Sequence, residues 1–113
     1  MRILLDECVD PRVKLLFGDL EASTVHEQRW DALEDGALLT AAQQEFDVLV
    51  TIDGGIEHQQ NLAKFRIGVV VAHVPKNQLS DYRVLEKELR SAVQRVRPGQ
   101  TIHVRMPPSE YAQ

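Results

Sequence analysis

The chain has few aromatic residues and a single cysteine, and both features limit the classes of fold that it can adopt. Three Phe, two Tyr and one Trp stand among 113 residues, so the core must be built largely from aliphatic side chains, which suits an α/β domain. The single cysteine, Cys8, cannot form a disulfide within the chain, which argues against a small disulfide-stabilised secreted fold.

Membrane segments and targeting signals are missing as well. No apolar run approaches the roughly 20 residues that a membrane-spanning helix needs. The chain begins directly with an apolar strand pattern and carries no signal peptide. We therefore expect a cytoplasmic protein of one domain with no membrane partner.

The chain also lacks a net positive charge, since its formal charge is −4. A globally acidic protein is a poor candidate for unaided nucleic-acid binding. The charge is unevenly divided, because residues 1–60 hold 13 acids and 4 bases, whereas residues 61–113 hold 4 acids and 9 bases. This asymmetry fits an acidic metal site beside a basic substrate or partner surface, and ordinary surface variation explains it equally well.

Short apolar runs without polar alternation recur along the chain. Such runs indicate strands of a parallel sheet that is buried on both faces. Helical patterns separate them, which predicts an α/β fold with a doubly wound parallel sheet of strand order 2-1-3-4-5. The expected strands are residues 2–5, 22–25, 48–52, 67–72 and 101–105.

Residues that favour helix starts precede three of the helical patterns. Asp10 is a good N-cap for a helix that ends at Gly18. A second helix is expected to begin at Asp35, and a third, long helix is expected to be capped by Ser80 and to end at Pro98.

The most informative feature is a carboxylate directly after each of two apolar strands. The strand at 2–5 is followed by Asp6 and Glu7, and the strand at 48–52 is followed by Asp53. These strands are neighbours in the expected order, and ligands of open α/β sheets bind beyond the carboxyl ends of such strands. Carboxylates this close repel one another, whereas a hard divalent cation with oxygen ligands removes the conflict. The pattern therefore predicts a metal-dependent site at Asp6 and Asp53, although either residue could simply cap the following turn.

Three further acids are candidates for the same site. Asp35 could supply a third carboxylate from the start of its helix, and it is equally well placed as a plain N-cap. Glu7 could turn into the site as the chain leaves the strand. Glu57, four residues past Asp53, could be a fourth carboxylate or a solvated loop acid.

Polar residues near these acids are candidates for substrate contacts. The Thr51 hydroxyl could hold a ligand or water, and Gln60 and Asn61 could hydrogen-bond substrate, although a strand residue and a solvated helix face explain them as well. Arg12 and Lys14 could contact phosphate or simply provide solubilising charge. The four histidines show no HxH or HExxH spacing and are expected to be mostly structural: His26, His58, His73 and His103.

Taken together, these segments make the chain similar to the small bacterial PIN-like proteins, relatives of the VapC-type ribonuclease toxins. The resemblance runs from Met1 to about Val104, and the order and spacing of its parts carry it. Those parts are Leu4-Leu5-Asp6-Glu7 with Pro11, Trp30 with Asp35-Gly36-Ala37-Leu38-Leu39, the strand that ends in Thr51-Ile52-Asp53, Gln59-Gln60-Asn61-Leu62, and the apolar strand before Pro75.

The resemblance implies a three-layer α/β/α fold with a mostly parallel five-stranded sheet over residues 1–105, followed by a C-terminal tail at 106–113. It implies hydrolysis of RNA phosphodiester bonds with Mg²⁺ or Mn²⁺, held by Asp6, Asp35 and Asp53 as catalytic and metal-binding residues with help from Glu7. It also implies the toxin half of a toxin–antitoxin pair, with a small DNA-binding antitoxin and a homodimer as expected partners.

Two alternatives stay open. Many relatives carry another Asp shortly after the Asp53 position, whereas the next acid here is Glu57, so the chain could be a catalytically weak or inactive module that binds RNA or protein. A phosphoacceptor receiver domain shares the acidic pair after the first strand and an Asp after the third. That reading lacks the Lys expected after the fifth strand, where Arg105 stands.

Overall fold

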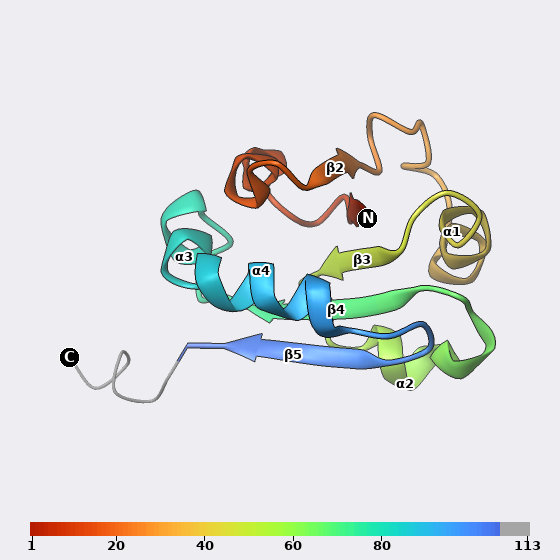
Figure 1. The fold of residues 1–113 in the computed structure, drawn as a ribbon. Coiled ribbons are helices and arrows are strands. Elements are labelled where there is room, and N and C mark those ends of the chain that lie inside the picture. The colour runs from red at the N-terminus through yellow and green to blue at the C-terminus, as the bar shows by residue number, and fades with distance from the viewer. Residues whose placement is uncertain (107–113) are drawn as a thin grey trace.

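A five-stranded sheet organises the computed structural model, which describes residues 1–106 (Figure 1). The strand order is β2-β1-β3-β4-β5, and every neighbouring pair is parallel. The strands are β1 (Arg2–Leu5), β2 (Glu21–Thr24), β3 (Val48–Thr51), β4 (Gly68–His73) and β5 (Thr101–Arg105). The helices are η1 (Pro11–Phe17), α1 (Asp35–Ala42), α2 (Ile56–Gln59), η2 (Leu62–Lys64), α3 (Leu79–Val84) and α4 (Glu86–Arg95).

The predicted α/β class and strand order are confirmed, and the sheet is fully parallel where the resemblance implied a mostly parallel one. Strands β1 and β3 pair directly, with Leu5 opposite Val50, so their carboxyl ends lie side by side. The chain reverses its direction of winding between these two strands. The sheet therefore has its topological switch point where the acidic residues were predicted to meet.

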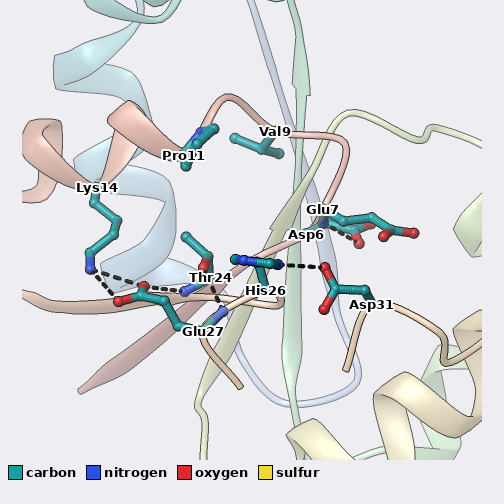
Figure 2. Close-up of a pocket in the computed structure, with 9 residues that line it drawn as sticks. All are labelled: Asp6, Glu7, Val9, Pro11, Lys14, Thr24, His26, Glu27 and Asp31. Atoms are coloured by element: carbon teal, nitrogen blue, oxygen red, sulfur yellow. Dashed lines mark hydrogen bonds and ion pairs between the residues drawn. The ribbon is translucent and has the colours of Figure 1, made fainter. Parts of the chain in front are cut away.

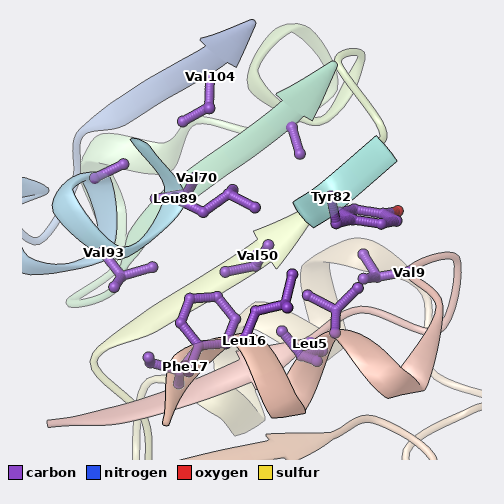
Figure 3. Packing of buried hydrophobic residues seen from close by; sticks show 14 of the residues in the cluster. Leu5, Val9, Leu16, Phe17, Val50, Val70, Tyr82, Leu89, Val93 and Val104 are labelled. Atoms are coloured by element: carbon purple, nitrogen blue, oxygen red, sulfur yellow. The ribbon is translucent and has the colours of Figure 1, made fainter. Parts of the chain in front are cut away.

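Alternate residues of the central strands feed two separate cores. Leu5 and Val50 face the layer that contains η1, α3 and α4 (Figure 3). Leu4 and Leu49 face the opposite layer, where they pack with side chains of α1 and α2. All four side chains are fully buried, because both faces of a parallel sheet are covered by crossover helices. This arrangement is the predicted three-layer α/β/α architecture.

The first helix, η1, is a 3-10 helix where an ordinary helix was expected. Asp10 caps it as predicted, since its carboxylate accepts a hydrogen bond from the backbone N–H of Arg12 at 3.0 Å, and Gly18 ends it at a φ of +57°. Residues three apart eclipse in a 3-10 helix, which aligns Val13 with Leu16 on the buried side.

The prediction of one long third helix was wrong. The chain forms α3 and α4, which meet at Leu85, where the backbone leaves helical geometry with φ −98° and ψ 6°. Leu85 at the break and Leu89 in α4 are both fully buried. Ser80 is not the cap either: Gln78 holds that position, and the Asp81 carboxylate accepts a hydrogen bond from its backbone N–H at 3.4 Å.

Met1 precedes β1, and Met106 is the last residue that the structure describes, so positions 107–113 of the predicted tail lie outside the described residues. Within residues 1–106, no helix combines the length and the apolar character that crossing a membrane requires.

Gly68 begins β4 at a point where no side chain fits. A Cβ there would lie 2.7 Å from Val96 Cγ1 and 3.1 Å from the carbonyl oxygen of Arg97. We expect Gly68→Ala to lower the free energy of unfolding by about 1–3 kcal/mol, because overpacking forces the neighbouring chain to move. Urea denaturation measures this change. Gly54→Ala is the control, since its Cβ would meet only His73 Cε1 at 3.9 Å; equal losses in both variants would contradict the packing argument.

Candidate acidic site

Asp6 stands at the carboxyl end of β1 and is nearly enclosed, with 8% of its surface exposed. Its backbone N–H continues the sheet by donating to the carbonyl of Val50 at 2.9 Å. The two carboxylate oxygens have separate partners: Oδ1 accepts from the backbone N–H of Glu7 at 2.9 Å, and Oδ2 accepts from the Thr51 hydroxyl at 2.8 Å. These bonds fix the direction in which the carboxylate points.

Thr51, the last residue of β3, connects the two acidic strand ends. Its fully buried hydroxyl donates to Asp6 and accepts from the backbone N–H of Asp53 at 3.1 Å. The Cys8 thiol lies 3.5 Å from the same oxygen. Thr51 was predicted as a residue that could hold a ligand or water. In the structure its hydroxyl is hydrogen-bonded to the Asp6 carboxylate and to the backbone N–H of Asp53.

Asp53 lies beyond β3 on an exposed turn. Its Oδ1 accepts a hydrogen bond from the backbone N–H of Gly55 at 2.9 Å, which is the local turn bond expected of an Asp in this position. The second carboxylate oxygen has no hydrogen-bond partner among the described residues. The turn role and a ligand role for Asp53 are therefore compatible.

Asp35 completes the group from the opposite side of the cleft. It is the first residue of α1, and Glu34 holds the N-cap position, so the plain N-cap interpretation of Asp35 was wrong by one residue. Burial raises the pKa of Asp35, and the negative charges of Asp6, Asp53, Glu34 and Glu7 raise it further. The fold has thus brought the predicted acids within electrostatic reach of one another.

The donor chemistry of this cluster fits a hard divalent cation. All of its ligating atoms would be carboxylate oxygens, and burial together with the neighbouring negative charges raises the pKa of Asp35, an effect that a bound cation would oppose. The side chains are not yet arranged as a ligand shell: residues 1–106 contain no group of three or more His, Cys, Asp or Glu side chains placed to hold a metal ion. Both Asp6 oxygens and one Asp53 oxygen accept hydrogen bonds from within the protein.

Asp6, Glu7 and Asp35 line a cleft with two adjoining parts, and the exposed Asp53 lines neither part. One part, of about 530 Å³, lies between the end of β1, η1 and the loop after β2 (Figure 2). The other, of about 710 Å³, lies over the start of α1 and is closed on one side by Gln59 and Gln60. Glu7 and Asp31 line both parts, so the two parts of the cleft share one continuous acidic surface.

The predicted phosphate contacts are already engaged in ion pairs. Arg12 bonds to the Asp10 carboxylate at 2.6 Å, and Lys14 bonds to that of Glu27 at 2.9 Å on the cleft wall. Among the predicted amides, Gln60 lines the cleft, whereas the exposed Asn61 does not. The basic side chains nearest the acids therefore carry little free positive charge.

Glu57, predicted as a fourth carboxylate, is directed elsewhere. Its Oε1 lies 2.5 Å from Nε2 of His103, and it is absent from the acids that raise the pKa of Asp35. Nδ1 of His103 in turn lies 2.8 Å from Nε2 of His73. Sequence reasoning missed this chain, because the histidines were expected to be mostly structural. The available signal was one His in each of two neighbouring strands. The register between these strands, which decides whether the two side chains meet, cannot be deduced from the sequence.

Removing the Thr51 hydroxyl tests its bridging role. Thr51→Val keeps the shape of the side chain but leaves one Asp6 oxygen and the Asp53 N–H without that partner. We expect a loss of about 1–3 kcal/mol in the free energy of unfolding, measured by urea denaturation. Thr40→Val is the matched control, because Thr40 is exposed and bonds only to a carbonyl of its own helix. Similar effects in both variants would rule out the bridge.

Removing one charge from the cluster should stabilise the protein. Because the folded pKa of Asp35 is raised above its ordinary value of 3.8, its stabilising contribution is complete below that pH and is lost as pH rises through the folded pKa. Repulsion and burial therefore outweigh the favourable position of a carboxylate at the start of a helix. Without divalent cations, we expect Asp35→Asn to raise Tm at pH 7 by about 2–5 °C and the gain to vanish near pH 3.

Calorimetry at the two pH values measures this difference. Asp19→Asn is the control, since that side chain is 90% exposed and lies outside the cleft. A lower Tm for Asp35→Asn at pH 7 would show that its carboxylate is not repelled by the cluster.

The chain matches no protein-family model, and no curated protein or solved structure is detectably similar to it. The function of the acidic cluster is therefore argued from the residues and geometry of this chain alone.

Proposed function

We propose that the chain is a metal-dependent ribonuclease of the PIN-like type, which hydrolyses RNA phosphodiester bonds as the toxin component of a toxin–antitoxin pair. One observation carries the proposal: Asp6, Asp35 and Asp53 come from three separate elements and lie, with Glu7, within electrostatic reach of one another near the topological switch point of a parallel sheet. A parallel sheet gains no stability from collecting like charges at this edge, so a role in binding accounts for them better.

In this proposal Asp6, Asp35 and Asp53 hold Mg²⁺ or Mn²⁺, and Glu7 lies beside them on the cleft wall. The bound cation supplies charge neutralisation and a water that is more readily deprotonated. Thr51 keeps the Asp6 carboxylate pointing toward the cleft, because its hydroxyl occupies the inner oxygen. The free oxygen of Asp53 and the exposed part of Asp35 are the groups open to a ligand.

The RNA strand would lie along the cleft formed by its two adjoining parts. Gln59 and Gln60 offer amide donors and acceptors at one wall, and the Lys14–Glu27 pair lies at the other. The acidic surface repels phosphate unless a cation is bound, so substrate binding is expected to depend on the metal. A small DNA-binding antitoxin and a second copy of the chain are the proposed protein partners.

A second function is favoured by the hydrogen bonds within the cluster. Since both Asp6 oxygens are engaged and no metal-holding group is preformed within residues 1–106, a module that binds RNA or protein without cutting fits the same site. A phosphoacceptor role for Asp53 fits less well, because β5 ends at Arg105, where that chemistry requires a Lys.

Cleavage of a mixed RNA pool with Mn²⁺ tests the proposal directly. We expect cleavage by the wild type and by Asp19→Asn, and a loss of about 100-fold or more in Asp6→Asn and Asp53→Asn, since each removes a ligand charge. Thermal unfolding run in parallel reports binding, because a cation that binds only the folded state raises Tm.

The two readouts separate the two functions. A Tm increase that Asp53→Asn abolishes, without RNA cleavage, would favour the non-cutting module. An equal Tm increase in the wild type and in Asp53→Asn would contradict the ligand set itself.

A further inference from the structure

Three side chains form a hydrogen-bonded chain outside the acidic cluster. Glu57 of α2 lies 2.5 Å from His103 of β5, and His103 lies 2.8 Å from His73 at the end of β4. The two imidazole rings stack with their centroids 5.0 Å apart and an interplanar angle of 30°. Glu57 and His103 are each about three-quarters buried, with 28% and 27% of their side chains exposed.

The donor and acceptor properties of the three side chains determine which of them donates each hydrogen bond. An ionised Glu57 only accepts hydrogen bonds, so Nε2 of His103 must donate to it. In a neutral His103 the other ring nitrogen is then an acceptor, and Nε2–H of His73 donates to it. Because His103 uses both of its nitrogens in line, the three groups do not converge on a point and form no metal site.

Helix α2, which carries Glu57, is not stable on its own. Helix α2 has four residues and no side-chain cap, and Ile56 is its one buried residue. Helices this short are unstable in water, so their position depends on tertiary contacts. The described contacts that fix α2 include the packing of Ile56, the bond from the Ile56 N–H to the Asp53 carbonyl and the hydrogen bond that His103 donates to Glu57.

The other side of α2 meets the acidic cleft. A Cβ on Gly36, next to Asp35, would lie 3.3 Å from Oε1 of Gln60, and one on Gly55 would lie 3.6 Å from Nε2 of Gln59. These two amides also close one wall of the cleft. A shift of α2 would thus move both amides relative to Asp35 and to the turn that carries Asp53.

We propose that Glu57, His103 and His73 act as a positioning device that fixes α2 against the β4–β5 edge, so that Gln59 and Gln60 form the substrate-binding wall of the acidic cleft. The inference deepens the proposed function and rests on it, since it takes the cleft to be where RNA binds. His103 is the central positioning residue, because it alone contacts both other members. Burial and the nearby positive charge of Arg105 lower the pKa of His73, which keeps its ring neutral.

Amide hydrogen exchange tests the positioning without reference to activity. The backbone N–H groups of Gln59 and Gln60 are bonded within α2, to Gly55 and Ile56. We expect His103→Leu to speed their exchange by about 10- to 100-fold, while amides of β1 and β3 keep the wild-type rate. His103→Gln should largely restore protection, because its amide can donate to Glu57 and accept from His73. Unchanged α2 exchange in His103→Leu would overturn the proposal.

Glu57→Ala provides a second route if His103→Leu folds poorly. Its side chain lies at the end of the chain, so we expect the same faster exchange in α2 and no further increase in the double variant. Independent, additive effects would show that the two residues act separately and would overturn the proposal.

Binding of a fluorescein-labelled mixed-sequence RNA oligonucleotide in Mn²⁺ completes the test. We expect weaker binding in His103→Leu and recovery in His103→Gln, whereas the Tm increase caused by Mn²⁺ stays as in the wild type. Faster α2 exchange with unchanged RNA binding would overturn the assignment of Gln59 and Gln60 to the substrate wall. Absence of RNA binding by the wild type would remove the proposed function, and the exchange rates would still decide whether the chain positions α2.

Discussion

The hydroxyl of Thr51 links the ends of the two strands that carry the acidic cluster. It joins Asp6 at the end of β1 to the backbone of Asp53 beyond β3 through two hydrogen bonds made in a fully buried position. The pairing of β1 with β3 brings the two strand ends together, and the hydroxyl then orients the Asp6 carboxylate and holds the backbone of Asp53. The neighbouring helices and loops form the cleft around this fixed pair.

Placing several acids at one edge of the sheet destabilises the folded protein, and the rest of the fold offsets this cost. Burial raises the pKa of Asp35 most, and repulsion from the neighbouring carboxylates raises it further. Two apolar cores, one on each face of the sheet, offset this cost through buried residues such as Leu5 and Leu49. A site that is destabilising in the absence of its ligand is common where function rather than stability has selected the residues.

A second hydrogen-bonded network, which includes Glu57 of α2, supports the cleft. Glu57 is bonded to His103 instead of joining the acidic cluster, so a residue that resembles a spare ligand in the sequence holds a helix in place. The acids and the amides of the cleft are thus supported by different networks. Thr51 orients the Asp6 carboxylate from within the sheet, and the hydrogen bonds of His103 hold the segment with Gln59 and Gln60 at the edge of the sheet.

The sequence by itself determined the fold class, the strand order and the positions of Asp6 and Asp53, because apolar runs and strand-end carboxylates are local patterns whose meaning a parallel sheet makes nearly unique. It did not determine the break at Leu85, since helical spacing continues across it and only packing against the sheet decides where the chain turns. Nor could it determine that Glu57 meets His103. That contact depends on the register of β5 and on the placement of a four-residue helix, both of which are set by tertiary packing and not by local preference.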